Sequence, residues 1–362
     1  MLFDADDPLG PAFRDAIEAT LSSIMADRRA EVVACEAALG PVVDALTPLA
    51  TAGKHVRAAF VWWGHAAVAG EPSDPAPLLK LAASLDLVHA GLLAHDDLMD
   101  GSDTRRARPS THRAIAAFSP PGNDTLGLAG AVVGGAMLLQ WAQQAADESG
   151  LTTSDAARAE LNALRSRVLT GQMVDAWAAA GLPLTGPGGA QRLGPAQVVA
   201  EIGDLKTASY TVVGPLRLGA SVAGATPQQL DAMTAFGRPL GHAFQSRDDV
   251  LGVFGDEQVT GKPAGDDLRE AKATQLVQNA LELAAPSDAA TLRAMLGNRS
   301  ATQADVAQAR AIIAGCGALD ATETAIAADL TRALDALDAA ELRPAGKAGL
   351  ASLAHACVHR HA

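Results

Sequence analysis

The residues best suited to chemistry form one short run, His95-Asp96-Asp97-Leu98-Met99-Asp100. Asp96 and Asp100 are four residues apart, so on a helix they share one face. Carboxylates so close together repel one another unless a cation lies among them. The preceding segment, 85–94, is apolar and expected to be buried, which disfavours an ordinary solvated helix end. The run therefore predicts a cation site.

A second acidic pair, Asp248-Asp249, follows the apolar stretch 233–244 about 150 residues later. Oxygen ligands of this kind suit hard cations, and Mg²⁺ usually takes one or two carboxylates together with phosphate oxygens and water. A di-iron site would require Glu-x-x-His pairs, which neither stretch contains. If both acidic helices face one bundle interior, they predict a metal–diphosphate site.

Basic residues accompany both acidic runs, although the chain carries a net charge of −13. A single Lys or Arg is usually a solvated surface side chain, but cations grouped beside acidic motifs indicate phosphate binding. The candidates are Lys54, Arg57, Arg105, Arg106, Arg108, His112, Lys206 with Thr207, and Lys262.

His89 precedes Asp96 by seven residues and Asp100 by eleven. At about 100° per residue, the three lie within roughly 40° of one another around the helix. A lone His on an apolar helix is usually a core residue, so a core role and a ligand role remain equally open.

The composition favours helices: 49% of residues are apolar, and only 3% are aromatic. The negative net charge argues against nucleic-acid partners and anionic membranes. Cys35, Cys316 and Cys357 have no metal-ligand spacing, and the acidic start is unlike a signal peptide, so we expect a cytoplasmic protein.

Helical periodicity runs between short breaks rich in Pro, Gly, Ser or Asp. We expect an all-α bundle of ten or more helices around a central cavity, forming a single domain over residues 1–362. The uncharged segment Thr125–Ala142 is expected to be a buried core helix and not a membrane span. The expected breaks are Glu71–Pro77, Ser119–Asp124, Leu182–Gly194 and Pro286–Asp288.

With these motifs in order, the chain resembles the trans-type isoprenyl diphosphate synthases, the short-chain polyprenyl synthetase family, and is most like its bacterial geranylgeranyl diphosphate synthases. The likeness runs from about Gly53 to Lys272. The run 96–100 with the trailing pair Arg105-Arg106 resembles the first aspartate-rich motif, DDxxD, and residues 244–274 resemble the second. The resemblance implies an isoprenoid-synthase-type fold, a homodimer and magnesium dependence, with three ions bound beside the diphosphate.

The resemblance also implies roles for individual residues. Magnesium would be held by Asp96, Asp97, Asp100, Asp248 and Asp249, which with Arg105 and Lys206 form the expected catalytic set. The allylic diphosphate would be contacted by Arg105, Lys206, Thr207, Gln245 and Lys262, and isopentenyl diphosphate by Lys54, Arg57, His89 and Arg106. Gln172 and Asp175 match an element that faces the cavity.

The chain departs from the family pattern at several positions. Gly252 stands where the second motif usually has its third aspartate, so a metal contact there would be absent or made by water. Ala107 replaces the usual Gly after the Arg pair, Gly134-Gly135 replaces a frequent Gly-Asp, and Ala-Lys-Ala surrounds Lys272.

The expected reaction is head-to-tail condensation of an allylic diphosphate with isopentenyl diphosphate, and the expected product is geranylgeranyl diphosphate (C20). Family members often stop growth with an aromatic residue four or five positions before the first Asp, where this chain has Leu92 and Gly91. The alternatives are a farnesyl (C15) or longer-chain product, a terpene cyclase of the same fold, or a non-catalytic subunit of a heteromeric synthase. The sequence alone does not identify the primer, the pathway or the oligomeric state.

Overall fold

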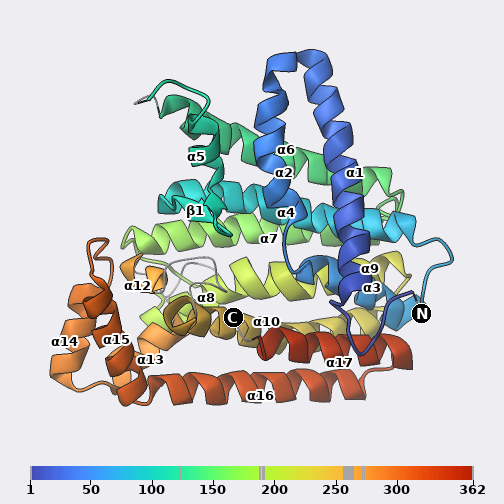
Figure 1. The fold of residues 1–362 in the computed structure, drawn as a ribbon. Helices are drawn as coiled ribbons and strands as arrows, with labels where there is room; N and C mark the ends of the chain where they lie inside the picture. Colours follow the sequence, from blue (N-terminus) through green and yellow to red (C-terminus); the bar gives the residue numbers. More distant parts are fainter. Residues whose placement is uncertain are drawn as a thin grey trace. The chain divides into compact units, whose positions relative to one another are not determined.

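Helices make up nearly all of the regular structure in this computed structural model, which describes residues 2–121, 124–186, 189, 192–255, 265–270, 272 and 274–360 (Figure 1). The N-terminal helices are α1 (Pro11–Cys35), η1 (Ala37–Leu39), α2 (Gly40–Thr51), α3 (Val56–Ala69), α4 (Ala76–Asp100), α5 (Thr111–Ala116) and α6 (Thr125–Glu148). Strands β1 (Thr104–Arg105) and β2 (Arg108–Pro109) form an antiparallel hairpin between α4 and α5.

The chain continues with α7 (Asp155–Ala179), α8 (Pro195–Ile202), η2 (Gly203–Val213), α9 (Gly214–Val222) and α10 (Pro227–Phe254). The C-terminal helices are α12 (Asp266–Arg269), α13 (Gln275–Leu283), α14 (Pro286–Met295), α15 (Gln303–Gly315), α16 (Ala318–Ala339) and α17 (Pro344–Val358). The predicted all-α fold is confirmed. The break expected at Pro286–Asp288 is wrong, because Pro286 is the first residue of α14, a position that tolerates proline.

Two compact units can be distinguished in the chain. The first comprises Met1–Leu161, Pro215–Leu230 and Glu341–Leu353, and the second comprises Asn162–Gly214, Asp231–Ala340 and Ala354–Ala362. The first acidic motif belongs to the first unit and the second motif to the second unit. The single domain over residues 1–362 stays a prediction.

Helix α4 forms the core of the first unit. Its predicted apolar stripe is buried, including Leu78, Leu81, Leu85 and Val88, and it packs against α1, α2, α3, α5 and α6. Gly101 ends the helix in the left-handed conformation, at a φ of 67° that glycine adopts without strain. The acidic run 96–100 is therefore the last turn of a buried helix.

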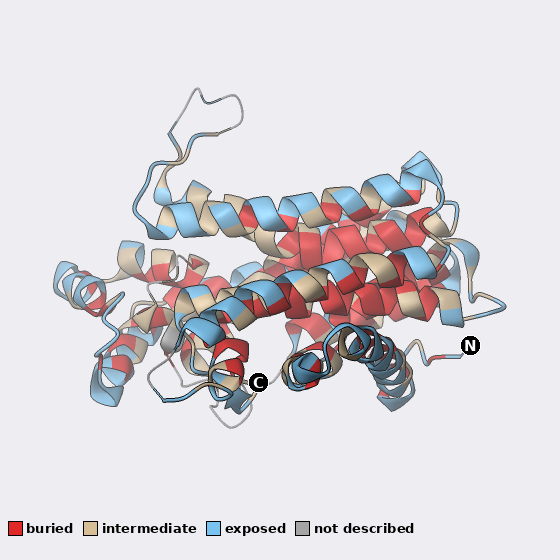
Figure 2. Ribbon diagram, turned by 90° about the horizontal axis from the view of Figure 1, so that it is seen from above, coloured by how far each residue is buried: buried red, intermediate tan, exposed pale blue. Residues whose placement is uncertain are grey.

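The second unit is built around the part of α10 from Asp231 onward, with α13 packed on α16 and α14 on α15. Met233, Phe236, Leu240 and Phe244 are buried along α10 and lead to the second acidic motif. Figure 2 shows buried residues following one side of most helices, with exposed residues on the other side.

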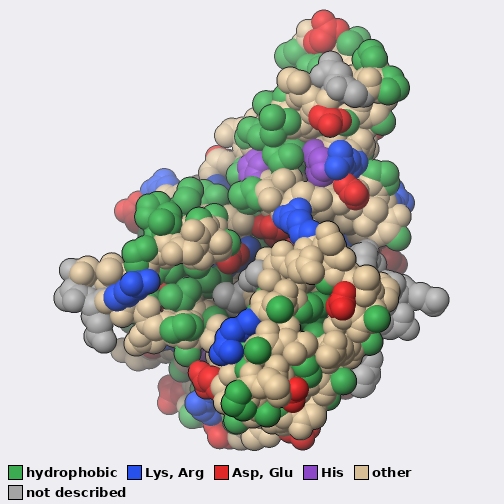
Figure 3. Space-filling model, turned by 90° about the vertical axis from the view of Figure 1, so that its left-hand side faces the viewer, with side chains coloured by type: hydrophobic (Ala, Val, Ile, Leu, Met, Phe, Trp, Pro, Cys, Tyr) green, Lys and Arg blue, Asp and Glu red, His purple; other side chains and the backbone are tan. Residues whose placement is uncertain are grey.

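Helix α6 was predicted to be a buried core helix, but only one of its faces is buried. Small residues such as Gly127, Ala131 and Gly135 are buried on one face, whereas Leu128 and Val133 on the other face are exposed. The glycines permit close approach of neighbouring helices on one side only. Figure 3 shows hydrophobic side chains exposed among acidic and basic ones on one face of the protein.

By length and composition alone, α4 and α6 could each cross a membrane, and a third candidate arises if α15 and α16 are taken as one span bent by 63°. The most apolar stretch is 67% buried within the protein in α4 and 39% buried in α6. The absence of a membrane span stays a prediction.

Candidate functional site

The first acidic motif occupies an electrostatically unfavourable place for carboxylates. Asp96, Asp97 and Asp100 lie in the last turn of α4, where the helix dipole is negative. Asp96 and Asp100 are half-buried, and Asp97 is fully buried. Such a concentration of negative charge requires compensating cations.

Arg105 supplies one of these cations. Its Nε donates to Asp97 Oδ1 over 2.9 Å, and its Nη2 donates to the same oxygen, while Asp97 Oδ2 has no hydrogen-bond partner. Burial acts against the Arg105 charge, but the hydrogen bond to Asp97 and the nearby acidic groups outweigh it and raise the pKa of Arg105. Asp97 therefore anchors Arg105, and direct metal ligation by Asp97 stays a prediction.

The β1–β2 hairpin positions both arginines of the pair. Its central residues, Arg106 and Ala107, have φ values of 52° and 58°, as a type I′ turn requires. The Arg106 side chain donates to the carbonyl oxygens of Leu49, over 3.4 Å, and Ala52. The hairpin is thereby tied to the loop that carries exposed Lys54.

His89 lies among positive charges. Burial is the main cause that holds the pKa of His89 well below its usual value, and the charges of Arg57, Arg106 and Arg105 add to it. A neutral imidazole close to three guanidinium groups is an environment suited to an anion. The structure thus brings together His89, Arg57, Arg105 and Arg106, as the prediction of a diphosphate site requires.

His55 was not identified from the sequence, yet it fixes the same loop. It is buried, adopts a φ of 53°, and its Nδ1 lies 2.7 Å from Asp86 Oδ2. Burial lowers the pKa of His55, but the hydrogen bond and attraction of Asp86, with help from Glu18, raise it overall. The ion pair holds the backbone between Lys54 and Arg57 in place.

In the second unit, Asp249 is 4% exposed and accepts a 2.6 Å hydrogen bond from Gln245 Nε2. Gln245 Oε1 in turn accepts a hydrogen bond from Thr207 Oγ1. Burial, with repulsion from Asp267 and Asp248, raises the pKa of Asp249 to about 7. The carboxylate of Asp249 is thus buried with two like charges nearby, and its binding of a cation stays a prediction.

Lys206 and Thr207 lie on η2, an eleven-residue π-helix, a form often found at functional sites. Lys206 Nζ donates to Asp175 Oδ2 over 2.8 Å. A Cβ at Gly171 would lie only 2.6 Å from the Lys206 backbone nitrogen, so glycine permits the close approach of α7 and η2. Gln172, the next residue of α7, is half-buried. The predicted residues Asp175, Lys206, Thr207, Gln245 and Asp249 are therefore joined in the second unit.

Residues 42–313 match the family model for polyprenyl synthetase. The chain is 35% identical to geranylgeranyl diphosphate synthase of Mycobacterium tuberculosis, over 76% of this chain and 71% of that protein. It is 32% identical to geranylfarnesyl diphosphate synthase of Aeropyrum pernix, over 72% of this chain and 75% of the relative. The chain belongs to the polyprenyl synthetase family.

The fold is also similar to a solved structure of geranylgeranyl pyrophosphate synthase from Corynebacterium glutamicum, complexed with isoprenyl diphosphate and magnesium. The two agree with a TM-score of 0.88 at 32% identity, over 99% of this chain and 100% of the other. The prediction of a prenyl-transferring family with an isoprenoid-synthase fold is confirmed. Product length is left open, because the relatives make products of different lengths.

The magnesium ligands remain a prediction for this polyprenyl synthetase. Within the residues that the structure describes, no three His, Cys, Asp or Glu side chains form a group that could hold a metal ion by themselves. Lys262, a predicted diphosphate contact, lies outside the described residues. The buried Asp249 and the acidic end of α4 nevertheless fit a site that diphosphate oxygens and bound cations complete.

Arg360 is a further residue that sequence reasoning missed. Its Nη2 lies 2.9 Å from Asp248 Oδ1, and its guanidinium carbon lies 4.0 Å from the centre of the Phe244 ring. The only sequence signal was a basic residue near the end of the chain. Arg360 neutralises Asp248 in this structure.

The structure changes the role expected for Gly91. A Cβ at this position would lie 2.9 Å from the Gly135 carbonyl oxygen and 3.0 Å from Leu139 Cγ. Gly91 thus permits α4 and α6 to approach closely, and an aromatic residue there would collide with α6. Leu92 is half-buried and is the better position for a chain-length test.

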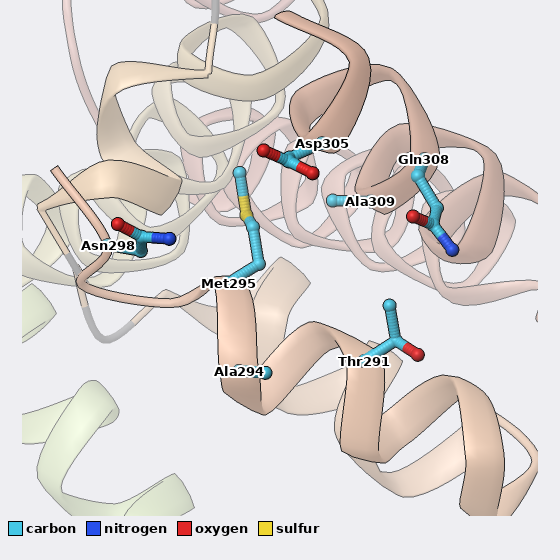
Figure 4. A pocket seen from close by; sticks show the side chains of 7 residues that line it. All are labelled: Thr291, Ala294, Met295, Asn298, Asp305, Gln308 and Ala309. Carbon is cyan, nitrogen blue, oxygen red and sulfur yellow. The ribbon is translucent and has the colours of Figure 1, made fainter. Parts of the chain in front are cut away.

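A separate pocket of about 280 Å³ lies between α14 and α15 (Figure 4). Its lining includes Thr291, Met295, Asn298 and Asp305. None of the residues that line it belongs to either acidic motif. Asp305 is already engaged in capping α15 through Thr302. This pocket is unrelated to the predicted diphosphate site.

Proposed function

We propose that this polyprenyl synthetase condenses an allylic diphosphate with isopentenyl diphosphate and releases geranylgeranyl diphosphate. The observation that carries the proposal is the pairing of two different receptors in a chain of this family. The first unit groups Arg57, Arg105 and Arg106 around neutral His89, and the second unit groups carboxylates around buried Asp249. That the two receptors hold the two substrates of one reaction is part of the proposal.

The anion receptor of the first unit would bind the isopentenyl diphosphate. Lys54, Arg57 and Arg106 supply positive charge, and His89, kept neutral, supplies a hydrogen bond without adding charge. Asp97 would hold Arg105 toward the allylic diphosphate, because a guanidinium anchored at one edge keeps other N–H groups for phosphate.

The second unit would bind the allylic diphosphate through Lys206, Thr207 and a divalent cation on Asp248 and Asp249. Magnesium, when bound, would neutralise the charge that develops on the departing diphosphate. The C–O bond would then break, the isopentenyl double bond would attack the allylic carbon, and the departing diphosphate would take up the proton that the new chain loses. Positioning of the two substrates lowers the barrier, and exclusion of water protects the allylic cation.

The decisive experiment incubates the purified full chain with ¹⁴C-labelled isopentenyl diphosphate and dimethylallyl, geranyl or farnesyl diphosphate. Parallel reactions contain Mg²⁺ or excess EDTA, and the dephosphorylated products are sized. We expect Mg²⁺-dependent C20 product from every primer. A C15 or longer limit would correct the product length alone.

The same reactions separate the alternatives from other classes. A terpene cyclase would convert the allylic diphosphates to hydrocarbons without isopentenyl diphosphate. A non-catalytic subunit would form no product by itself. Either outcome would refute the proposal. Sedimentation at several protein concentrations tests the proposed homodimer.

A further inference from the structure

Asp204 lies in the first turn of η2, two residues before Lys206, and contacts two basic side chains of α10. Its Oδ2 accepts a 2.6 Å hydrogen bond from Arg238 Nη2, and its Oδ1 lies 2.6 Å from His242 Nε2. All three residues belong to the second unit. The predicted diphosphate and metal site includes none of them, so the predicted chemistry leaves their contact unexplained.

The face of α10 that meets Asp204 continues toward the second acidic motif. Arg238, His242 and Gln245 are spaced by four and three residues, so their side chains share one face of the helix. Asp204 contacts the first two, and Thr207 Oγ1 donates to Gln245 Oε1. Two separate attachments to the same face of α10 prevent η2 from rotating about its own axis.

Close packing between these attachments leaves η2 little room to move. A Cβ at Gly241 would lie 2.5 Å from both Cα and Cβ of Ala208, so only glycine at 241 permits this approach. The Arg238 side chain is 63% exposed and that of His242 is 37% exposed. Exposed ion pairs of this kind contribute at most about 1 kcal/mol to stability. Their directional hydrogen bonds to Asp204 therefore matter more for the orientation of η2 than for the stability of the fold.

Lys206 contacts a different helix, α7. Its Nζ donates to Asp175 Oδ2, and the Lys206 backbone lies close to Gly171. Because η2 is wound as a rigid π-helix between α7 and α10, a rotation would move Lys206 from Asp175 and Thr207 from Gln245 together. The attachment at Asp204 thus controls the position of two predicted contacts of the allylic diphosphate.

We propose that Asp204 is a positioning residue, which Arg238 and His242 hold so that it sets the orientation of η2. The ammonium group of Lys206 and the hydroxyl group of Thr207 are thereby held toward the allylic diphosphate. This inference rests on the proposed function and deepens it, because it assigns recognition of the allylic substrate to a contact outside both acidic motifs. Asp204 itself touches no substrate.

The test uses the full-length protein and compares Asp204→Ala, Asp204→Asn and Arg238→Ala/His242→Ala with the wild type. Asp231→Ala, which removes an exposed carboxylate of α10, is the matched control. Steady-state rates give kcat and KM separately for geranyl diphosphate and isopentenyl diphosphate. Calorimetric titration with the thiolo analogue of geranyl diphosphate, in which sulfur replaces the bridging oxygen, measures binding without turnover. Thermal unfolding monitors the fold.

We expect Asp204→Ala and Arg238→Ala/His242→Ala to lower kcat/KM for geranyl diphosphate by roughly 10- to 100-fold, a loss that a displacement of about 1 Å can cause. Binding of the analogue should weaken as well. The KM for isopentenyl diphosphate and the unfolding temperature should stay close to those of the wild type. Asp204→Asn should have a smaller effect, because its amide oxygen still accepts one hydrogen bond.

A double-mutant cycle separates positioning from a purely structural role. Asp204→Ala is introduced into the wild type and into the variant Lys206→Ala/Thr207→Ala. If Asp204 acts through these two residues, its loss should change analogue binding by less than about twofold in the second background. A purely structural contact would give the same loss in both backgrounds.

Equal losses in the two backgrounds would overturn the inference, and so would unchanged analogue binding in folded Asp204→Ala. An equal rise of both KM values would also contradict it. Condensation by the wild type is measured in parallel. If the wild type makes no prenyl diphosphate, the proposed function fails, and analogue binding still tests the role of Asp204. If the wild type makes product while Asp204→Ala binds the analogue normally, only the role of Asp204 fails.

Discussion

The two acidic motifs solve the problem of buried negative charge in different ways. In the first unit, Asp97 is fully buried but is paired with Arg105. In the second unit, Asp249 is almost as deeply buried, yet its neighbours are the amide of Gln245 and two further carboxylates. Asp97 is neutralised by Arg105, whereas Gln245 leaves the charge of Asp249 uncompensated, so the prediction of a bound cation applies most directly to Asp249.

The difference indicates that Asp97 and Asp249 have different roles. A carboxylate already satisfied by arginine can orient that arginine but gains little from a metal. A buried carboxylate without a cationic partner gains much from one. Substitutions in the two motifs should therefore have different consequences for stability even where they have the same consequence for turnover.

The largest effect is expected from Asp96→Ala and Asp248→Ala. If both motifs bind the same magnesium–diphosphate, each substitution should lower kcat by roughly 10²- to 10³-fold while the thermal unfolding curve stays near that of the wild type. Steady-state rates with labelled isopentenyl diphosphate measure the effect. Asp155→Ala, whose side chain is 99% exposed, is the control. A near-normal rate for either variant would remove that motif from the metal site.

The next effect contrasts Asp97→Asn with Asp249→Asn. Asp97→Asn leaves the buried Arg105 charge without its partner and should lower the free energy of unfolding by about 3 kcal/mol. Asp249→Asn removes a carboxylate whose pKa is raised to about 7 and should stabilise the metal-free protein at pH 8. Urea unfolding at pH 8 in EDTA measures both values. Equal losses in the two variants would contradict the comparison.

A smaller effect concerns neighbouring positions on α4. Gly91→Phe should destabilise the protein by about 1–3 kcal/mol, because the ring meets Gly135 and Leu139. Leu92→Phe should keep stability closer to that of the wild type and shift products toward shorter chains. Thermal unfolding and product sizing are compared for both variants. A stable Gly91→Phe with shortened product would restore position 91 as the length determinant.

The pH dependence of stability should differ between the units. The folded-state pKa of His55 is raised, so its ion pair stabilises the first unit fully below about pH 6.5 and loses this contribution as pH rises through the folded pKa. For one proton the slope is at most about 1.4 kcal/mol per pH unit. Asp86→Asn should flatten the slope between pH 6.5 and 8.5 in urea unfolding. An identical slope in wild type and variant would exclude His55 as its source.

In the second unit, Asp204 has the opposite dependence. Burial opposes its charge, but His242 Nε2 and Arg238 Nη2, each 2.6 Å from its carboxylate, lower the pKa of Asp204 to about 2. Its contribution is present above the unfolded-state pKa and is lost as pH falls toward 2. Arg238→Ala should raise the pH at which acid unfolding begins.

The smallest effect is expected at the β1–β2 turn. Ala107 adopts a φ of 58°, where glycine is unstrained. Ala107→Gly should raise the free energy of unfolding by about 0.5–1 kcal/mol and leave kcat unchanged. Urea unfolding of the wild type and variant measures the change. A loss of stability would show that the turn is not strained by alanine.

Much of the fold followed from local patterns in the sequence. The apolar stripe of α4, the acidic run at its end and the second acidic pair on α10 were all predicted, because helical spacing fixes which residues share a face. The grouping of Arg57, Arg105 and Arg106 near His89 was expected from the motif resemblance and is observed in the first unit.

The remaining features depend on which segments meet in space. Nothing in the spacing of Asp97 shows that a hairpin returns Arg105 to it, or that Gly91 faces Gly135 on α6. Asp267 lies fifteen residues beyond Gly252, and the sequence between them has no pattern that predicts their contact. The exposed face of α6 was not predicted, because the segment carries no charged residues that would mark one face as exposed.

The π-helical turn of η2 has a consequence for anyone who redesigns this chain. Backbone hydrogen bonds in a π-helix join residues five apart, so Leu205 and Tyr210 lie one turn apart. In an ordinary α-helix, the residue one turn after Leu205 would be Ser209. Deleting one residue between 203 and 213 would let the segment relax to the commoner winding. The ammonium group of Lys206 would then rotate away from Asp175, although every other residue of the protein remained the same.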